Sequence, residues 1–312
     1  MNKIIGHKAQ ITNITKFRSN NLHQSIIFSG SKGIGKYSLA KFFINWMLAK
    51  RLNVNSENLE FFLDKKKIEE LKPFRTSNIF ELNNDFLIKS KIDDVRKVIK
   101  EISLTNSTLI NQKFILIDNF NTLNLNSKNA LLKNIEEPPK NTYIILIDHN
   151  VLESPKTIKS RCINIRFSNL NKIQFSDFLI HNDIKFSEKD LLQGFSYSDG
   201  RPGIFLKMME NDWKEILKKI NYILKQKIIP QKEFKFILEN YEQNPIVIDI
   251  LIKKHLFFIL KKILLKNIND LNIYKQIIKY FDFLKHPLKA DLNLNNKQYL
   301  SNLFLNFKLI KI

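Results

Sequence analysis

The chain has 312 residues, 44% of them hydrophobic and 26% charged, a composition that excludes a mainly disordered or collagen-like protein. Its 51 Lys and Arg residues exceed its 30 Asp and Glu residues, so the formal net charge is +21. An excess of this size favours acidic partners, such as nucleic acid or an acidic protein face. The single cysteine, Cys162, excludes an intrachain disulfide and a zinc site built on several cysteines, and it indicates a reducing compartment.

Two features bear on targeting. The first residues contain no apolar run of the length found in a signal peptide, and lysines interrupt the most apolar stretch, residues 246–268. We therefore expect neither secretion nor a membrane span.

Short β-rich apolar runs lie in the first half of the chain, with helical patterns between them. This alternation is typical of βα units around a parallel sheet, so residues 1–168 are predicted to form an α/β domain. The helix before the third strand is expected to begin with Ser127 as its N-cap and to end before Pro138. The predicted strands are residues 25–29, 113–118, 143–148 and 162–167.

The second half is predicted to be all-α. Residues 169–210 carry short helical stretches and a Gly- and Pro-containing turn at 198–203. Residues 211–312 form a further domain. From Trp213 onward, 19 Lys stand against 8 Asp and Glu; solvated helix faces are the expected reason, and a nucleic-acid surface is the alternative. The expected helices are residues 213–229, 231–242, 246–267, 271–285 and 296–310.

A glycine-rich turn follows the first predicted strand and leads into a helix. Gly30, Gly33, Gly35 and Lys36 fit the first seven positions of the phosphate-binding pattern G-x-x-x-x-G-K-[ST]. In such a loop the backbone N–H groups, the helix N-terminus and the lysine all attract phosphate. The eighth position is Tyr37, where the chemistry requires a hydroxyl that binds magnesium. The pattern predicts a degenerate site that is compatible with ATP or ADP but requires no cofactor.

The strand at residues 113–118 ends in a second nucleotide-site element. Asp118 lies where a Walker B aspartate would hold the metal, although a simple cap of the strand end is the alternative interpretation. In AAA+ ATPases, which these motifs resemble, a glutamate usually follows and activates the attacking water. Here the next residue is Asn119, whose amide cannot accept that proton.

Four stretches together resemble the AAA+ clamp-loader subunits of bacterial replication: residues 22–36, 92–99, 114–148 and 157–167. The most specific parts are NALLKNIEEPP at Asn129–Pro139 and SRC at Ser160–Cys162. The resemblance implies a RecA-like AAA+ parallel-sheet domain over residues 1–168. It also implies a small helical lid over residues 169–210 and a C-terminal helical collar over residues 211–312.

Within that family the chain resembles the delta-prime subunit more than the motor subunit, gamma/tau. The motor carries a zinc module, a complete magnesium-binding loop, the Walker B glutamate and a sensor-2 arginine. This chain lacks them, with Gly203 at the expected sensor-2 position near Arg201. The resemblance therefore implies a scaffold with no zinc or other metal and with little or no ATPase activity of its own.

The resemblance gives Arg161, in SRC, the role of an arginine finger for ATP bound to the neighbouring motor subunit. A fixed guanidinium of this kind accelerates phosphoryl transfer by about 10³ to 10⁵. The alternative is a structural arginine that pairs with a local carboxylate. Cys162 is expected to be a small buried hydrophobe, and the six histidines, which show no metal-binding spacing, are expected to be packing or surface residues.

The implied partners are the gamma/tau and delta subunits, with the sliding clamp and primed DNA reached through the complex and no membrane involved. The setting would be the cytoplasmic DNA polymerase III holoenzyme, a DNA-directed DNA polymerase. Two other functions stay open: an active clamp-loader ATPase with unusual motifs, and an AAA+ module whose basic helical half binds DNA directly.

Overall fold

The computed structural model describes residues 4–16, 24–51, 78–83, 112–149, 155–267, 270–285 and 294–310, together with Val95, Lys97, Val98 and Lys100. The chain forms two compact units. The first comprises residues 1–191 and 200–203, and the second comprises residues 192–199 and 204–312. The predicted division into three domains, at residues 168 and 210, stays a prediction.

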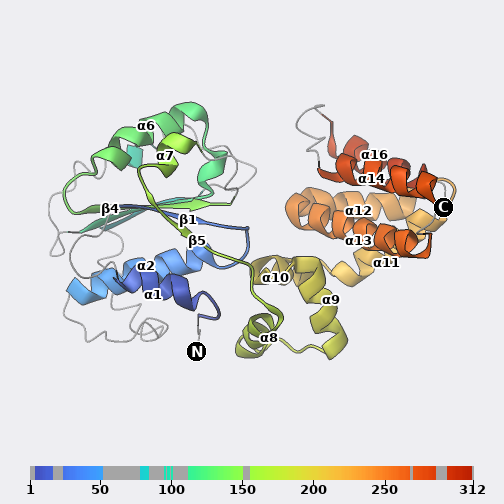
Figure 1. Cartoon of the computed structure of the whole chain (residues 1–312), viewed down its shortest axis with the longest axis horizontal. Coiled ribbons are helices and arrows are strands. Elements are labelled where there is room, and N and C mark those ends of the chain that lie inside the picture. The colour runs from blue at the N-terminus through green and yellow to red at the C-terminus, as the bar shows by residue number, and fades with distance from the viewer. Residues whose placement is uncertain are drawn as a thin grey trace. The chain divides into compact units, whose positions relative to one another are not determined.

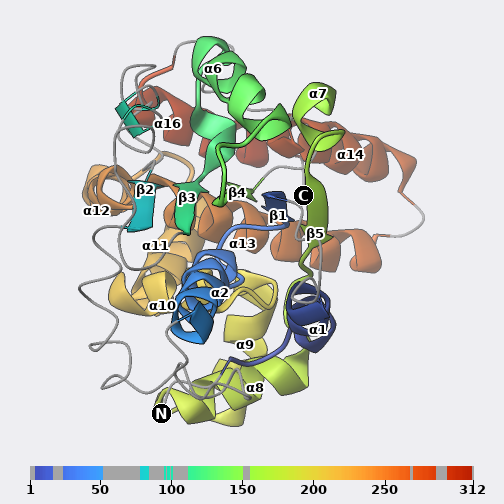
Figure 2. The ribbon, with the colours of Figure 1, turned by 90° about the vertical axis from the view of Figure 1, so that its left-hand side faces the viewer.

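A parallel sheet forms the centre of the first unit. Its strand order in the described residues is β2-β3-β4-β1-β5, which runs from left to right in Figure 2. In the register of the sheet, Ile27 of β1 lies opposite Leu146 of β4 and Asn164 of β5. The strands are β1 (Ser25–Ser29), β2 (Ile79–Asn83), β3 (Lys113–Asp118), β4 (Thr142–Asp148) and β5 (Ile163–Arg166).

The four predicted strands are confirmed, and β2 is a strand that the sequence analysis missed. Among the described strands, β2 lies at the edge of the sheet and pairs with β3, with Phe80 opposite Ile115. Its apolar run is short, and Glu81 in its middle resembles a loop residue. The strand forms because pairing with β3 satisfies its backbone, which is a tertiary effect that local sequence does not carry.

Helices cover both faces of this sheet, as Figure 1 shows. Because side chains alternate along a strand, Ile26 and Phe28 pack on the side of α2, whereas Ile27 packs on the side of α6. Both sets are almost completely buried, which explains why the strands read as continuous apolar runs. The covering elements are α1 (Lys8–Lys16) and α2 (Lys36–Arg51) on one face and η2 (Phe120–Thr122), α6 (Leu125–Glu136) and α7 (Lys156–Lys159) on the other.

The start of α6 corrects the predicted cap. The N-cap is Asn124, whose side chain accepts a hydrogen bond of 2.7 Å from the backbone N–H of Ser127. Ser127 lies inside the first turn and is buried, so the prediction that it caps the helix is wrong. The end is as predicted, since α6 stops at Glu136, before Pro138.

The remaining described elements are helices. The five helices predicted from Trp213 onward are confirmed within a few residues at each end. Helix α8 belongs to the first unit, and α11 to α16 belong to the second. These helices are α8 (Lys172–His181), α9 (Glu188–Ser198), α10 (Pro202–Glu210), α11 (Trp213–Lys225), α12 (Gln231–Gln243), α13 (Pro245–Lys266), α14 (Leu271–Lys285) and α16 (Asn296–Lys308).

Helix α13 is the centre of the second unit. Its buried side chains, such as Ile252, Leu256 and Leu260, share one core with residues of α11, α12, α14 and α16. None of the described helices is long and apolar enough to cross a bilayer. The apolar character of α13 is therefore explained by burial within a helical bundle.

A buried histidine connects three helices of this unit. In α13, His255 accepts a hydrogen bond of 2.7 Å at Nδ1 from the hydroxyl of Tyr197 in α9, and its Nε2 lies 2.9 Å from Oδ1 of Asn221 in α11. A neutral imidazole with the proton on Nε2 satisfies both contacts. Burial, followed by the charge of Lys262, lowers the pKa of His255 from 6.5 to about 4.

This histidine makes the second unit sensitive to acid. Between pH 6.5 and about 4 the unfolded chain binds the proton that folded His255 excludes, so stability falls as the pH falls through this window. The full difference corresponds to about 3 kcal/mol. We expect His255→Gln to flatten this dependence in urea unfolding followed by the fluorescence of Trp213, the tryptophan of this unit. An unchanged slope would contradict the assignment.

Candidate functional site

The predicted phosphate loop connects β1 to α2, and its backbone depends on glycine. Gly30, Gly33 and Gly35 have φ angles of 142°, 85° and 95°, a region that favours glycine. A Cβ atom at Gly30 would lie 2.4 Å from the backbone oxygen of Phe167, after β5. The predicted loop is therefore present, and its first glycine is required by close packing as well as by backbone conformation.

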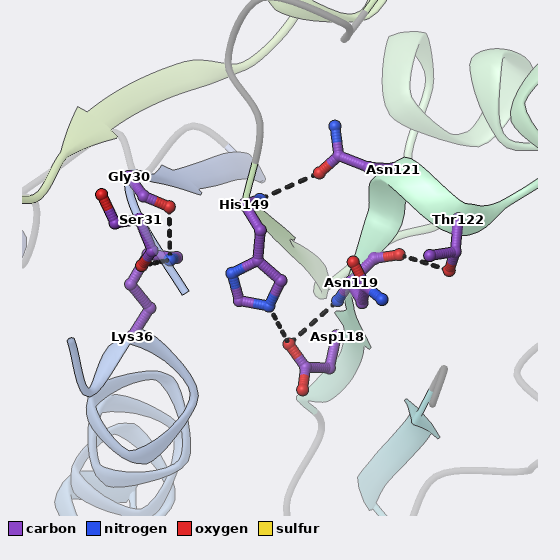
Figure 3. A network of polar contacts seen from close by, with 8 residues as sticks. All are labelled: Gly30, Ser31, Lys36, Asp118, Asn119, Asn121, Thr122 and His149. Atoms are coloured by element: carbon purple, nitrogen blue, oxygen red, sulfur yellow. Dashed lines mark hydrogen bonds and ion pairs between the residues drawn. The ribbon is translucent and has the colours of Figure 1, made fainter. Parts of the chain in front are cut away.

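Lys36 is directed back onto its own loop. Its Nζ donates hydrogen bonds of 2.6 Å to the carbonyl oxygens of Gly30 and Ser31, as Figure 3 shows. The side chain is buried, and burial lowers its pKa from 10.5 to about 7, although Asp118 and Asp148 act in the opposite direction. Two of the three N–H donors of the Lys36 ammonium are thus used by backbone carbonyl groups. Because of the lowered pKa, only part of the Lys36 side chains carry the positive charge near neutral pH.

Tyr37 does not replace the missing magnesium ligand. Its hydroxyl donates a hydrogen bond of 2.8 Å to Oε2 of Glu81 in β2, and its ring packs against the core beside α2. Glu81 is also paired with Lys41 at 3.0 Å, and the Lys41 ammonium lies 4.6 Å from the centre of the Tyr37 ring. The donor set of the loop therefore does not fit magnesium, because the residue at the ligand position is committed elsewhere.

Asp118 lies at the end of β3, in the network drawn in Figure 3. Its Oδ1 accepts a hydrogen bond of 2.9 Å from the backbone N–H of Asn119 and lies 3.4 Å from Nε2 of His149, the residue after β4. Burial lowers the pKa of His149, which opposes the effect of its hydrogen bond to Asp118. Asn121, in η2, accepts a hydrogen bond from the His149 backbone, which joins the two strand ends.

Asn119 occupies the position at which an active AAA+ ATPase usually carries its catalytic glutamate. It has φ 53° and ψ 48°, the left-handed conformation that asparagine adopts more readily than most residues. Its backbone oxygen accepts hydrogen bonds from the backbone N–H and the hydroxyl of Thr122. The residue shapes the turn after β3, and its amide supplies no general base.

Gly203 reaches the phosphate loop. Its backbone N–H donates a hydrogen bond of 2.8 Å to the oxygen of Gly33, and a Cβ atom at Gly203 would lie 3.1 Å from that oxygen. The assignment of Gly203 to the sensor-2 position stays a prediction. A larger residue at position 203 would have to displace the phosphate loop. The close contact with Gly33 therefore favours glycine at this position.

Arg161 lies outside this network, in the turn between α7 and β5. Its Nε forms an ion pair with Oε1 of Glu136, and its Nη1 donates to the carbonyl oxygen of Thr157 at 2.9 Å and to Oγ of Ser160 at 3.2 Å. The ion pair of the structural alternative is therefore present. The side chain is nevertheless 40% exposed, so its proposed role in trans stays a prediction.

Cysteine and histidine residues take several roles. Cys162 is partly buried, and burial raises the pKa of its thiol to about 12, which fits the predicted packing role. His7 contacts the carbonyl oxygen of Ile34 and the ring of Phe167, so it packs against the phosphate loop. His149 is mostly buried, as expected of a packing residue, and its ring also lies 3.4 Å from Asp118, a contact that the sequence did not predict.

Sequence reasoning missed Glu81 and His149 because their roles depend on tertiary structure. A signal for His149 existed: residues that directly follow parallel strands meet at one edge of the sheet. The described residues contain no group of three or more His, Cys, Asp or Glu side chains that could hold a metal ion. The predicted absence of zinc itself stays a prediction.

Comparison with known families identifies the chain. A profile described as "DNA polymerase III, delta subunit" matches residues 7–171, more than half of the chain. The chain belongs to this family. It is a member of the AAA+ clamp-loader proteins of DNA replication, and the phosphate loop, the β3 aspartate and Arg161 all lie within the matched residues.

Individual relatives include both types of clamp-loader subunit. The chain is 30% identical over 249 residues to the gamma subunit of Buchnera aphidicola subsp. Schizaphis graminum, which covers 77% of the chain and 66% of that protein. It is 30% identical to Haemophilus influenzae tau/gamma over 57% of the chain and 25% of that protein. It is 33% identical to the delta′ subunit of the same Buchnera over 46% of the chain and 42% of that protein. The chain thus spans less than two thirds of each of these relatives.

One solved structure covers almost the whole chain. It is a DNA polymerase III gamma subunit-related protein from Thermotoga maritima, 17% identical, with a TM-score of 0.50. The match covers 97% of this chain and 99% of that one. At this identity the likeness concerns the fold, which is a RecA-like AAA+ domain with helical parts.

The chemical capacity of the site follows from these contacts. The loop retains the glycine backbone that receives phosphate, but its lysine already has protein acceptors and its hydroxyl ligand is missing. The position after Asp118 offers no base. The arrangement therefore keeps the backbone of a nucleotide-binding loop while the lysine and the residue at the magnesium-ligand position are bonded to the protein itself.

Proposed function

We propose that this chain is the delta-prime subunit of a DNA polymerase III clamp loader. It is a largely non-hydrolysing AAA+ scaffold that supplies Arg161 in trans to ATP bound by a neighbouring gamma/tau subunit while the sliding clamp is loaded on primed DNA. One observation carries the proposal. Lys36 and Tyr37, which would serve ATP and magnesium in a working loop, donate instead to the protein's own carbonyl and carboxylate oxygens.

The chemistry offered in trans is electrostatic. Charge that develops on a transferring phosphoryl group is stabilised by a guanidinium held beside it, because the planar fork of arginine matches the phosphate oxygens. The proposed arginine keeps an exposed edge and is anchored by its own chain. The chain's own loop takes no part in this step.

The proposed partners are the gamma/tau and delta subunits, joined mainly through the helices from Trp213 onward. The sliding clamp and primed DNA are met through the complex, and the proposed location is the cytoplasm. Membership of the clamp-loader family supports a complex of this type. The choice of delta-prime over gamma/tau rests on the degenerate loop.

Two measurements test the proposal. The isolated chain is expected to hydrolyse ATP at a rate close to the uncatalysed background, because it lacks the magnesium ligand and the general base. Mixed with gamma/tau and delta, it is expected to form a stable complex whose ATPase responds to the clamp and primed DNA. Vigorous turnover by the chain alone would instead identify an active gamma/tau-like subunit, and failure to join the complex would remove the proposal altogether.

A further inference from the structure

Arg161 is fixed along one edge of its guanidinium. Nε is taken by the carboxylate of Glu136, and Nη1 donates both to the backbone oxygen of Thr157 and to the hydroxyl of Ser160. In the part of the chain that the structure describes, Nη2 makes no hydrogen bond. The side chain therefore has a held edge and a free end.

The carboxylate that holds it has a rigid base. Glu136 is the last residue of α6, and Ile135 before it is buried against the sheet. The carbonyl oxygen of Ile135 accepts a hydrogen bond of 3.1 Å from the hydroxyl of Ser25, at the start of β1. The C-terminal end of α6 is thus hydrogen-bonded to a central strand, which fixes the backbone position of Glu136.

Helix stability does not explain a glutamate at this place. A negative side chain at the C-terminus of a helix is disfavoured by the helix dipole. The ion pair is also exposed on both sides, with 40% of Arg161 and 45% of Glu136 accessible, and ion pairs of this kind contribute little to folding. What the pair does provide is one orientation for a long and flexible side chain.

We infer that Glu136 is a positioning residue, which directs the free end of Arg161 toward an anionic group on a partner. The inference rests on the proposed function, in which that group is the phosphoryl of ATP on the adjacent subunit. A carboxylate beside the guanidinium reduces its net charge, so removing Glu136 would leave an arginine with more charge and less order. Activity that depends on placement would then fall, whereas activity that depends only on charge would rise.

The test uses the mixed complex and four variants: Arg161→Ala as the reference, Glu136→Ala, Glu136→Gln and, as a matched control, Glu137→Ala. Glu137 is the next residue, exposed and outside the Arg161 contacts. We expect Glu136→Ala to cause roughly half or more of the loss in kcat that Arg161→Ala causes, with little change in KM for ATP. Glu136→Gln retains an oxygen that accepts from Nε and should recover most of the activity, and Glu137→Ala should match the unmodified complex.

A second readout needs no partner. The chain has few arginines, so the Nε–H signal of Arg161 can be assigned by its loss in Arg161→Ala. Its exchange with water should accelerate in Glu136→Ala but not in Glu137→Ala, with both variants equally folded by circular dichroism. Unchanged exchange would overturn the inference at the level of geometry.

The outcomes separate the two ideas. If Arg161→Ala slows the complex while Glu136→Ala does not, the positioning role is overturned and the proposed function stands. If Arg161→Ala itself has no effect, the proposed function fails and the inference fails with it. Equal losses of activity in Glu136→Gln and Glu136→Ala would show that the charge of Glu136 matters and not its hydrogen bond to Arg161. An equal loss in Glu137→Ala would show that any negative charge in this region has the same effect. Either result overturns the inference.

Discussion

In the proposed complex, Arg161→Ala should slow ATP hydrolysis at the gamma/tau site beside this chain by roughly 10³-fold or more, the usual contribution of a guanidinium in trans. The reason is that Arg161 combines an exposed guanidinium with anchoring by its own chain, as a finger that acts in trans requires. The measurement is the steady-state ATPase of the mixed complex with clamp and primed DNA. If the complex contains several ATPase sites, the other sites stay active. The total ATPase rate should then fall by the fraction that this one site contributes.

Two substitutions control this result. Arg161→Lys keeps the charge but lacks the planar fork, so it should recover little of the lost activity. Arg166→Ala removes an exposed arginine from the neighbouring strand β5 and should leave the rate unchanged. Assembly of each variant is checked by gel filtration. An assembled Arg161→Ala complex with full activity would exclude the finger role.

Gly30→Ala should produce the largest loss of stability among the loop variants. Gly30 has φ 142°, and its added methyl group would meet the backbone oxygen of Phe167 at 2.4 Å, an atom directly after β5 that cannot rotate away as a side chain could. Backbone strain and overpacking together should cost roughly 4 kcal/mol. That is a large part of the stability of an ordinary domain.

Gly35→Ala is the matched control for this prediction. Gly35 has φ 95°, but no atom lies within 4 Å of the place that an added methyl group would take, so only backbone strain of roughly 1–2 kcal/mol is expected. Urea unfolding in a Trp213→Phe background would report on the first unit through Trp46, which lies in α2. Equal losses of unfolding free energy in the two variants would show that the contact with Phe167 does not contribute to the destabilisation.

Much of the fold could be predicted from local patterns. Four strands and the helices after Trp213 have strong signals, because their apolar periodicity coincides with burial. The predictions that failed concern elements whose structure depends on contacts with other parts of the chain. Strand β2 forms through its pairing with β3, and α6 is capped by Asn124, whose side chain accepts a hydrogen bond from the backbone of Ser127.

The candidate site divides in the same way. The glycines, Lys36 and Asp118 follow a motif with fixed spacing, so sequence alone identifies them. The partners of these residues come from elsewhere in the chain: Tyr37 meets Glu81, and Asp118 meets His149. Pairs separated by tens of residues leave no local trace, which is why sequence could identify the loop and could not say how it is used.

The contacts of Tyr37 have an evolutionary consequence. Its ring fills part of the core and its hydroxyl binds Glu81, which also pairs with Lys41. Threonine at this position would restore a hydroxyl of the right type but would leave a void under α2 and deprive the carboxylate of one partner. A single change to threonine would therefore lose packing and a hydrogen bond before it could supply a magnesium ligand, so the present contacts of Tyr37 oppose a return to the standard loop residue.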